Sequence, residues 1–117
     1  MTTLLRSRTI RSAGKQGLSA KICGDMRFEW DPNKDRANQQ KHGISFEEAA
    51  TAFDDELQIT ILDPDHSVGE FRYVTLAVTG RGLLVAVAHT EDEDDHIRII
   101  SARPASTRER RTYEERF

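Results

Sequence analysis

Two arginines stand inside an apolar β-strand pattern near the end of the chain. Residues 97–103 read Ile-Arg-Ile-Ile-Ser-Ala-Arg, so Arg98 and Arg103 share the segment with three isoleucines. A strand aims a side chain more rigidly than a loop does, and the planar guanidinium presents a fork of donors that suits phosphate. Period 2 predicts that the two arginines point to opposite faces of the sheet, so one is expected to be structural. Arg103 is the first choice for a phosphate site and Arg98 the second.

Composition predicts a single domain with a polar surface. Of 117 residues, 37% are hydrophobic and 32% are charged. No apolar run approaches the roughly 20 residues that span a bilayer, so a membrane protein is excluded. The only cysteine, Cys23, excludes an intrachain disulfide and a cysteine-based metal or redox site, which fits a reducing cytoplasm.

Charge divides the chain into two unlike parts. Residues 1–25 carry a net charge of +4 without a sustained apolar period, whereas residues 26–117 carry −7. The basic part is typical of a disordered N-terminal extension, and residues 26–117 are expected to form the domain. Met26 stands directly before the first strand-like segment, so the alternative is that translation starts there and the extension is a gene-start artefact.

Turn and cap residues predict the elements that position the arginines. Asp31 and Pro32 open a polar helix that ends near His42, and Ser45 and Ser106 cap two further helices. The expected class is α+β, with an antiparallel sheet packed by helices in the order β-α-α-β-β-β-β-α. Alternating residues predict strands at 26–30, 57–62, 71–79, 83–90 and 97–103.

Short motifs follow one another in a fixed order after Met26. They are Phe28-Glu-Trp-Asp-Pro32, Asn38, Lys41-His-Gly43, Phe46-Glu-Glu-Ala49, Phe53-Asp54-Asp55, Asp63, His66, Glu70-Phe-Arg72, Leu83-Leu84-Val85, His89-Thr-Glu91, Arg98-Ile-Ile-Ser-Ala-Arg103, Glu109 and Tyr113-Glu114. With these motifs in this order, the chain resembles the BrnT toxins of bacterial type II toxin–antitoxin modules. The resemblance spans nearly everything after Met26.

That resemblance implies a RelE-like fold and a ribonuclease that cleaves RNA and arrests translation. It also implies neutralisation by a BrnA-type antitoxin with a ribbon-helix-helix part. Operator DNA would then be reached only indirectly, through the antitoxin, and no membrane is involved.

Cleaving RNA without a metal requires a base for the 2′-hydroxyl, cations for the charge at phosphorus and an acid for the 5′-oxygen. A histidine titrates near neutral pH, which makes His89 or His42 a candidate acid or base. No cofactor is expected. The expected catalytic residues are Arg103, His89, Glu91, Arg98 and Tyr113. The expected RNA-binding residues are Lys41, His42, Arg72, Arg108, Arg110 and Arg111.

An acidic domain repels RNA at long range, so its basic residues are expected to gather on one face. The last strand and helix supply Arg98, Arg103, Arg108, Arg110, Arg111 and Arg116. Such a face would also suit an acidic segment of the antitoxin, so RNA and antitoxin are expected to compete for it.

Structural alternatives remain open for several of these residues. An ion pair with Glu91 or Asp95 is the alternative for Arg98, and a hydrogen bond at a sheet edge is the alternative for His89. Lys41 and His42 can complement the negative end of their helix. Phe28 and Trp30 are expected to be core aromatics, with base stacking as the alternative, and Tyr113 can equally pack onto the sheet.

Two further alternatives concern the acidic turn between residues 89 and 96. Its imidazole and carboxylate groups are possible ligands of a divalent ion, although acidic runs at hairpin tips are usually solvated. Relatives commonly carry an arginine where this chain has Asp92. The competing function is therefore a catalytically impaired toxin homologue that acts as a binding or co-repressor subunit with its antitoxin.

Overall fold

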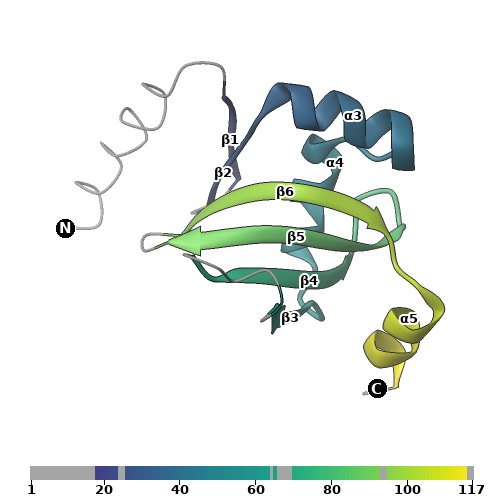
Figure 1. Cartoon of the computed structure of the whole chain (residues 1–117). Helices are drawn as coiled ribbons and strands as arrows, with labels where there is room; N and C mark the ends of the chain where they lie inside the picture. The colour runs from purple at the N-terminus through teal and green to yellow at the C-terminus, as the bar shows by residue number, and fades with distance from the viewer. Residues whose placement is uncertain (1–17, 24–25, 64, 66–69, 93–94, 116–117) are drawn as a thin grey trace.

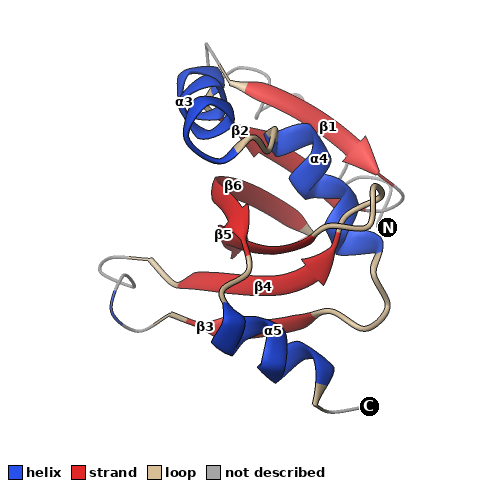
Figure 2. Ribbon diagram, turned by 90° about the vertical axis from the view of Figure 1, so that its right-hand side faces the viewer, coloured by secondary structure: helices blue, strands red, loops and turns tan. Residues whose placement is uncertain are grey.

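A six-stranded sheet with helices on both faces forms the part of the chain that the computed structural model describes, residues 18–23, 26–63, 65, 70–92 and 95–115 (Figures 1 and 2). The strands are β1 (Ser19–Cys23), β2 (Met26–Trp30), β3 (Ile59–Leu62), β4 (Arg72–Val78), β5 (Leu84–Asp92) and β6 (His96–Pro104). The helices are α3 (Pro32–His42), α4 (Phe46–Thr51), the 3-10 turn η1 (Ala52–Asp54) and α5 (Thr107–Glu114).

The spatial order of the strands is β1-β2-β6-β5-β4-β3. Each neighbouring pair is antiparallel except β2 and β6, which run parallel. The prediction of an antiparallel sheet is therefore wrong at this pair. The connection from β2 to β6 contains two helices and three strands, and a crossover of this length permits parallel pairing.

β1 adds a strand that the predicted order lacked. It pairs antiparallel with β2 in register from Ser19 opposite Trp30 to Cys23 opposite Met26. The expectation of disorder throughout residues 1–25 is thus wrong for 19–23, and residues 1–17 lie outside the described residues. The observed order begins β-β-α-α and then follows the prediction, apart from η1.

The predicted helix ends are confirmed. The Asp31 side chain accepts a hydrogen bond from the backbone N–H of Asn33, and α3 ends at Gly43, whose φ of 73° is left-handed. Ser45 caps α4 by accepting from Glu48 N. Ser106 and the carboxylate of residue 109 form a reciprocal capping box at the start of α5.

Two apolar clusters lie on opposite faces of the sheet. The larger lies beneath α3 and α4 and contains Phe28, Trp30, Phe46, Phe53, Val85, Val87, Ile97, Ile99 and Ala102. The smaller is covered by α5 and contains Leu76, Leu84, Ala86 and Tyr113. Figure 2 shows α3 and α4 on one side of the strands and α5 on the other. Phe28 and Trp30 are core aromatics, as expected.

β6 contains a β-bulge that resets its alternation. Ala88 of β5 pairs with Ser101, but the next residue, His89, pairs with Ile99. Ile100 is therefore an extra residue with no partner on β5. An inserted residue of this kind shifts the two-residue period of the strand by one position.

The bulge places both arginines of β6 on the same face. Ile97 precedes the bulge and Ala102 follows it, yet both belong to the core cluster beneath α3 and α4. Arg98 and Arg103 must then both lie on the other face, toward α5. The prediction of opposite faces was wrong because strict alternation makes no allowance for an inserted residue.

Asn38 explains how the polar helix α3 is held on the sheet. It is the buried residue of α3, and its Nδ2 donates to the carbonyls of Ala102 (2.7 Å) and Ile44 (2.8 Å). Its Oδ1 accepts from the backbone N–H of Ala102 at 3.1 Å. The amide thus satisfies both backbone groups of one β6 residue, just past the bulge.

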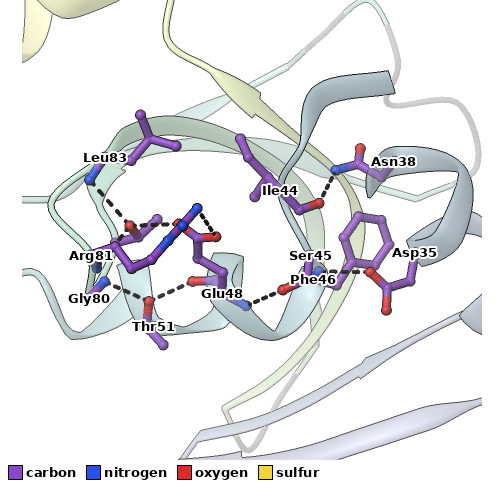
Figure 3. Close-up of polar contacts among 11 residues, drawn as sticks. Asp35, Asn38, Ile44, Ser45, Phe46, Glu48, Thr51, Gly80, Arg81 and Leu83 are labelled. Atoms are coloured by element: carbon purple, nitrogen blue, oxygen red, sulfur yellow. Dashed lines mark hydrogen bonds and ion pairs between the residues drawn. The ribbon is translucent and has the colours of Figure 1, made fainter. Parts of the chain in front are cut away.

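The turn between β4 and β5 is tied to α4 (Figure 3). Glu48 accepts hydrogen bonds from Arg81 Nε (3.0 Å), from its terminal nitrogen (2.8 Å) and from Thr79 Oγ1 (3.1 Å). Gly80 N donates to Thr51 Oγ1 at 2.8 Å. These bonds fix the hairpin of β4 and β5 against the helix layer.

Replacing Asn38 should destabilise the fold. In Asn38→Ala three buried backbone groups lose their partner, so we expect the free energy of unfolding to fall by about 2 kcal/mol or more. Urea unfolding measures this change. Gln40→Ala is the matched control, because Gln40 is exposed on the same helix and its loss should cost less than about 0.5 kcal/mol. Equal effects of the two substitutions would contradict the role assigned to Asn38.

Candidate active site

Four side chains form a row across the face of the sheet toward α5. The strand register places Glu29 of β2 beside Arg98, Arg98 beside Thr90, and Thr90 beside Arg72. Residues paired across neighbouring strands point to the same face. Arg98 and Arg72 therefore flank Thr90, with their backbones two strand spacings, roughly 10 Å, apart. We call Glu29, Arg98, Thr90 and Arg72 the arginine row.

A pocket of about 270 Å³ adjoins the arginine row. Arg98 is exposed and forms no ion pair or side-chain hydrogen bond with the described residues, so its guanidinium is available to a ligand. The alternative of an ion pair with Glu91 or Asp95 is not seen in that part of the chain. The pocket is lined by Glu29, Glu70, Phe71, Thr90, Glu91, Asp92, His96 and Arg98.

His96 forms one wall of the pocket. Its Nδ1 is hydrogen-bonded to Asp92 Oδ2 at 3.0 Å, and its Nε2 lies 3.0 Å from Oε1 of the buried Glu29 in an ion-pair contact. Because these three residues come from β6, β5 and β2, the contacts hold the ends of three strands together. Their positions around the pocket are thereby fixed.

Glu91 combines solvent access with a perturbed pKa. Partial burial, and secondarily the charge of Asp95, raise the pKa of this carboxyl above its usual range. Its side chain lies on the same face of β5 as His89, with Oε2 3.5 Å from His89 Nδ1, and remains 41% exposed. A carboxyl whose pKa moves toward neutrality exchanges protons more readily at physiological pH, as a general acid or base must.

His89 points into the core and is 0% exposed. Its ring lies 5.0 Å from that of Phe53 and 5.9 Å from that of Tyr73, centroid to centroid, and its Nε2 is 2.7 Å from Thr75 Oγ1. Burial lowers the pKa of His89 to about 4, so the ring is neutral at pH 7. This position does not suit the catalytic role expected for His89; it is a hydrogen-bonded core histidine.

Tyr113 anchors α5 to the sheet. Its ring is buried in the smaller apolar cluster, and its hydroxyl donates to Asp55 Oδ2 at 2.5 Å. The same carboxylate oxygen accepts from the backbone N–H of Val78 at 2.9 Å. The catalytic role expected for Tyr113 is therefore not supported by its position, because its hydroxyl holds an interior contact.

Arg103 is engaged by the last helix. Its two terminal nitrogens donate to the two carboxylate oxygens of Glu109 at 2.7 and 2.8 Å. This bond is the main reason why the pKa of Glu109 falls to about 2. Glu109 also accepts from Ser106 N at the start of α5. Arg103 is thus committed to joining β6 to α5, although 43% of its side chain is exposed.

The expected RNA-binding residues are brought together only in part. Arg72 joins the arginine row, where it also contacts Glu70 at 4.0 Å. Lys41 and His42 end α3 on the opposite face of the sheet. α5 packs at the Leu84 end of β5, whereas the row lies at the Thr90 end.

The basic residues of α5 are balanced by neighbouring acids. Arg110 pairs with Glu114 at 3.4 Å, and Arg111 approaches Glu115 at 3.9 Å. Arg108 is exposed, and residue 116 lies outside the described residues. The described basic residues therefore do not form the expected single basic face. Arg98 and Arg72 lie in the arginine row, and the arginines of α5 stand beside acidic residues of the same helix.

The described residues of the acidic turn, 89–92 and 95–96, do not converge on a metal site. His89 points into the core, whereas His96 contacts Glu29 on the face toward α5. Among the described residues no group of three or more His, Cys, Asp or Glu side chains is arranged to hold a metal ion.

A comparison with known protein families shows which family this chain belongs to. Residues 30–109 match the family described as "Ribonuclease toxin, BrnT, of type II toxin-antitoxin system". The chain belongs to the BrnT family. The expected resemblance is thereby confirmed, over more than half of the sequence.

A solved BrnT structure is also similar to this chain. It is the 1.1 Å crystal structure of the Brucella abortus ribonuclease toxin BrnT, with a TM-score of 0.44 and 23% sequence identity, covering 67% of this chain and 94% of that chain. A comparison with curated proteins finds no match. No helix among the described residues is long and apolar enough to cross a membrane.

Six of the eight residues that line the pocket of this BrnT-family chain were not among the predicted site residues: Glu29, Glu70, Phe71, Thr90, Asp92 and His96. Phe71 lies within a recognised motif, but only its exposure shows that it does not serve the core. Glu29 and His96 are 67 positions apart in the sequence, and their contact depends on the parallel pairing of β2 with β6. Alternation in 26–30 does place Glu29 on the face away from Trp30, which was the available signal.

Acid should destabilise the fold through His89. The pKa is about 4 in the folded state and near 6.5 in the unfolded chain, so the unfolded state binds more protons between these values. Well above pH 6.5 the titration of His89 does not lower the free energy of unfolding. As pH falls below 6.5 this free energy decreases, by roughly 3 kcal/mol at pH 4. Urea unfolding at pH 7 and pH 4.5 measures the loss.

The control for this prediction separates His89 from the other titrating groups. His89→Gln should lose less stability than the unmodified chain between the two pH values, because glutamine does not titrate. His42→Gln should keep the original loss, since His42 ends α3 and is only partly buried. The same loss in His89→Gln as in the unmodified chain would contradict the assignment.

Proposed function

We propose that this chain is a metal-independent endoribonuclease toxin that cuts RNA at the arginine row and inhibits translation. The observation that carries the proposal is the placement of Arg98 and Arg72 on either side of Thr90, next to the pocket that Glu91 lines. Guanidinium groups held on a rigid sheet suit a phosphodiester and the charge that develops at phosphorus.

In the proposed reaction the proton of the 2′-hydroxyl passes to a carboxylate that lines the pocket. The 2′-oxygen then attacks phosphorus, and the 5′-oxygen leaves with a proton from solvent, which gives a 2′,3′-cyclic phosphate and a 5′-hydroxyl. Arg98, which forms no ion pair within the described part of the chain, stabilises the negative charge at phosphorus. Arg103 has a structural role instead, because it joins β6 to α5 through Glu109. The sequence alone favoured Arg103 over Arg98 as the phosphate-binding residue, so the order of the two is reversed.

Family membership supports the biological setting of the proposal. The partner is a BrnA-type antitoxin with a ribbon-helix-helix part, and operator DNA is contacted only through that partner. The toxin acts in the bacterial cytoplasm, with a RelE-like arrangement of its fold. The antitoxin neutralises it by placing acidic side chains on the arginine row, where they displace RNA.

One observation favours the competing function of a catalytically impaired binding subunit. Asp92 lines the same pocket as Arg98, at the position where the resemblance to BrnT toxins implies an arginine. Its carboxylate adds negative charge close to where RNA phosphates would approach, which weakens their binding. The experiment below separates the two functions.

Arg98→Ala should abolish RNA cleavage without unfolding the protein. Loss of a preorganised charge donor lowers turnover by about 100-fold or more. The melting temperature should stay unchanged, because Arg98 forms no ion pair with the described residues. The measurement uses purified protein, labelled single-stranded RNA and EDTA, with detection of the cyclic-phosphate end and a thermal melt.

Arg103→Ala is the matched control on the same strand and face. It should retain cleavage while losing about 1 kcal/mol of stability, because the partly exposed pair with Glu109 is broken. Wild-type activity in Arg98→Ala would refute the site. Cleavage that stops in EDTA would refute metal independence, and intact RNA under every condition would favour the impaired homologue.

Induction of the gene in a bacterium should stop growth and protein synthesis. Co-expression of the adjacent ribbon-helix-helix protein should restore both, because it covers the arginine row. Incorporation of a labelled amino acid measures translation directly. Arg98→Ala should be harmless, and growth arrest by this variant would show that toxicity does not depend on the arginine row.

A further inference from the structure

Phe71 exposes a large aromatic surface at the rim of the pocket. It is 65% exposed, whereas Phe28, Phe46 and Phe53 are buried in the core. Phe71 also lines the pocket that contains Arg98. An exposed aromatic ring beside an RNA-cleaving group is suited to stacking on an unpaired base, because every base presents a π face.

The chemistry of the pocket lining indicates which part of RNA can enter it. Four acidic residues, Glu29, Glu70, Glu91 and Asp92, line the pocket together with a single arginine, Arg98. Clustered carboxylates repel a phosphate, but they accept hydrogen bonds from the N–H groups of a nucleobase. The phosphate therefore belongs at the guanidinium of Arg98, and the base belongs against the acidic residues of the pocket.

Thr90 and Asp92 present complementary groups to a base edge. The Thr90 hydroxyl forms no hydrogen bond with the described residues and can donate. Asp92 is held in orientation by His96 Nδ1 at 3.0 Å, and its carboxylate retains acceptor sites. A volume of about 270 Å³ lies near the lower limit of ligand pockets, which suits one base rather than a longer segment.

We propose that this pocket is a nucleobase subsite that selects guanine beside the cleaved bond, with the base stacked on Phe71. Guanine offers N1–H and N2–H₂ donors to Asp92 and its O6 acceptor to Thr90. Adenine, cytosine and uracil each offer fewer donors on that edge. The subsite rests on the proposed ribonuclease activity, because the base arrives as part of the RNA whose phosphate lies on the arginine row.

The test uses two oligonucleotides that differ in one base. Each carries a single guanosine or a single inosine in a sequence of adenosine and uridine, and inosine lacks only the 2-amino group. The protein should cut beside guanosine, and the inosine oligonucleotide should have a kcat/KM lower by about 10-fold, as expected for a lost charge-assisted hydrogen bond. Asp92→Asn should erase this difference between the two oligonucleotides.

Phe71→Ala should raise KM for the guanosine oligonucleotide by about 10-fold, the order expected for loss of one stacking contact. Phe71→Trp should keep the original KM. Ile22→Ala is the matched control, since Ile22 is similarly exposed at 61% but lies on β1 at the opposite sheet edge. Its KM should not change.

The outcomes distinguish the subsite from the ribonuclease activity. Cleavage without preference for guanosine, or equal effects of Phe71→Ala and Ile22→Ala, would overturn the subsite and leave the ribonuclease proposal standing. If no RNA is cut, the proposed function fails, and fluorescence anisotropy then compares binding of the two oligonucleotides. Equal affinity for both would overturn the subsite as well, whereas tighter binding of guanosine that Phe71→Ala removes would support it.

Discussion

The single extra residue in β6 is the constraint on which the candidate site depends. With strict alternation, one of the two β6 arginines would be buried beneath α3 and α4. The bulge at Ile100 turns both toward α5, and Asn38 fixes the backbone of the next buried residue, Ala102. α3 therefore contributes to the site by a backbone clamp on the arginine-bearing strand, without touching the site itself.

The two arginines then take different roles because their neighbours differ. Arg103 binds the carboxylate of Glu109, which also caps α5, so its positive charge is neutralised within the fold. Arg98 lies five positions earlier, beyond the reach of α5 and beside a pocket. The same residue type on the same face is structural at one end of the strand and available for chemistry at the other.

Local patterns predicted most of the elements because the information lies within a few residues. The caps at Asp31, Ser45 and Ser106 and the hairpin turn near Gly80 are read from neighbouring side chains, and all are observed. β1, the parallel pairing of β2 with β6 and the bulge were missed. Each depends on which strand lies alongside, and that information is not local.

The same distinction separates the predicted residues that lie at the candidate site from those that do not. His89 and Tyr113 were proposed for their chemistry, but their neighbours Thr75 and Asp55 come from distant segments and hold them inside. Arg98 and Arg72 have suitable chemistry and also share a cross-strand row. Residue type predicts what a side chain can do, and only register decides whether it reaches solvent.

The position of β6 in the sheet has a consequence for the order of events during synthesis. Among the described strands β6 comes last in the sequence, yet it lies inside the sheet between β2 and β5. The clamp from Asn38 to Ala102 joins residues 64 positions apart. A nascent chain on the ribosome therefore cannot complete the sheet until its last strand has emerged. The candidate site of this chain therefore forms only after the β6 residues, up to Pro104, have left the ribosome.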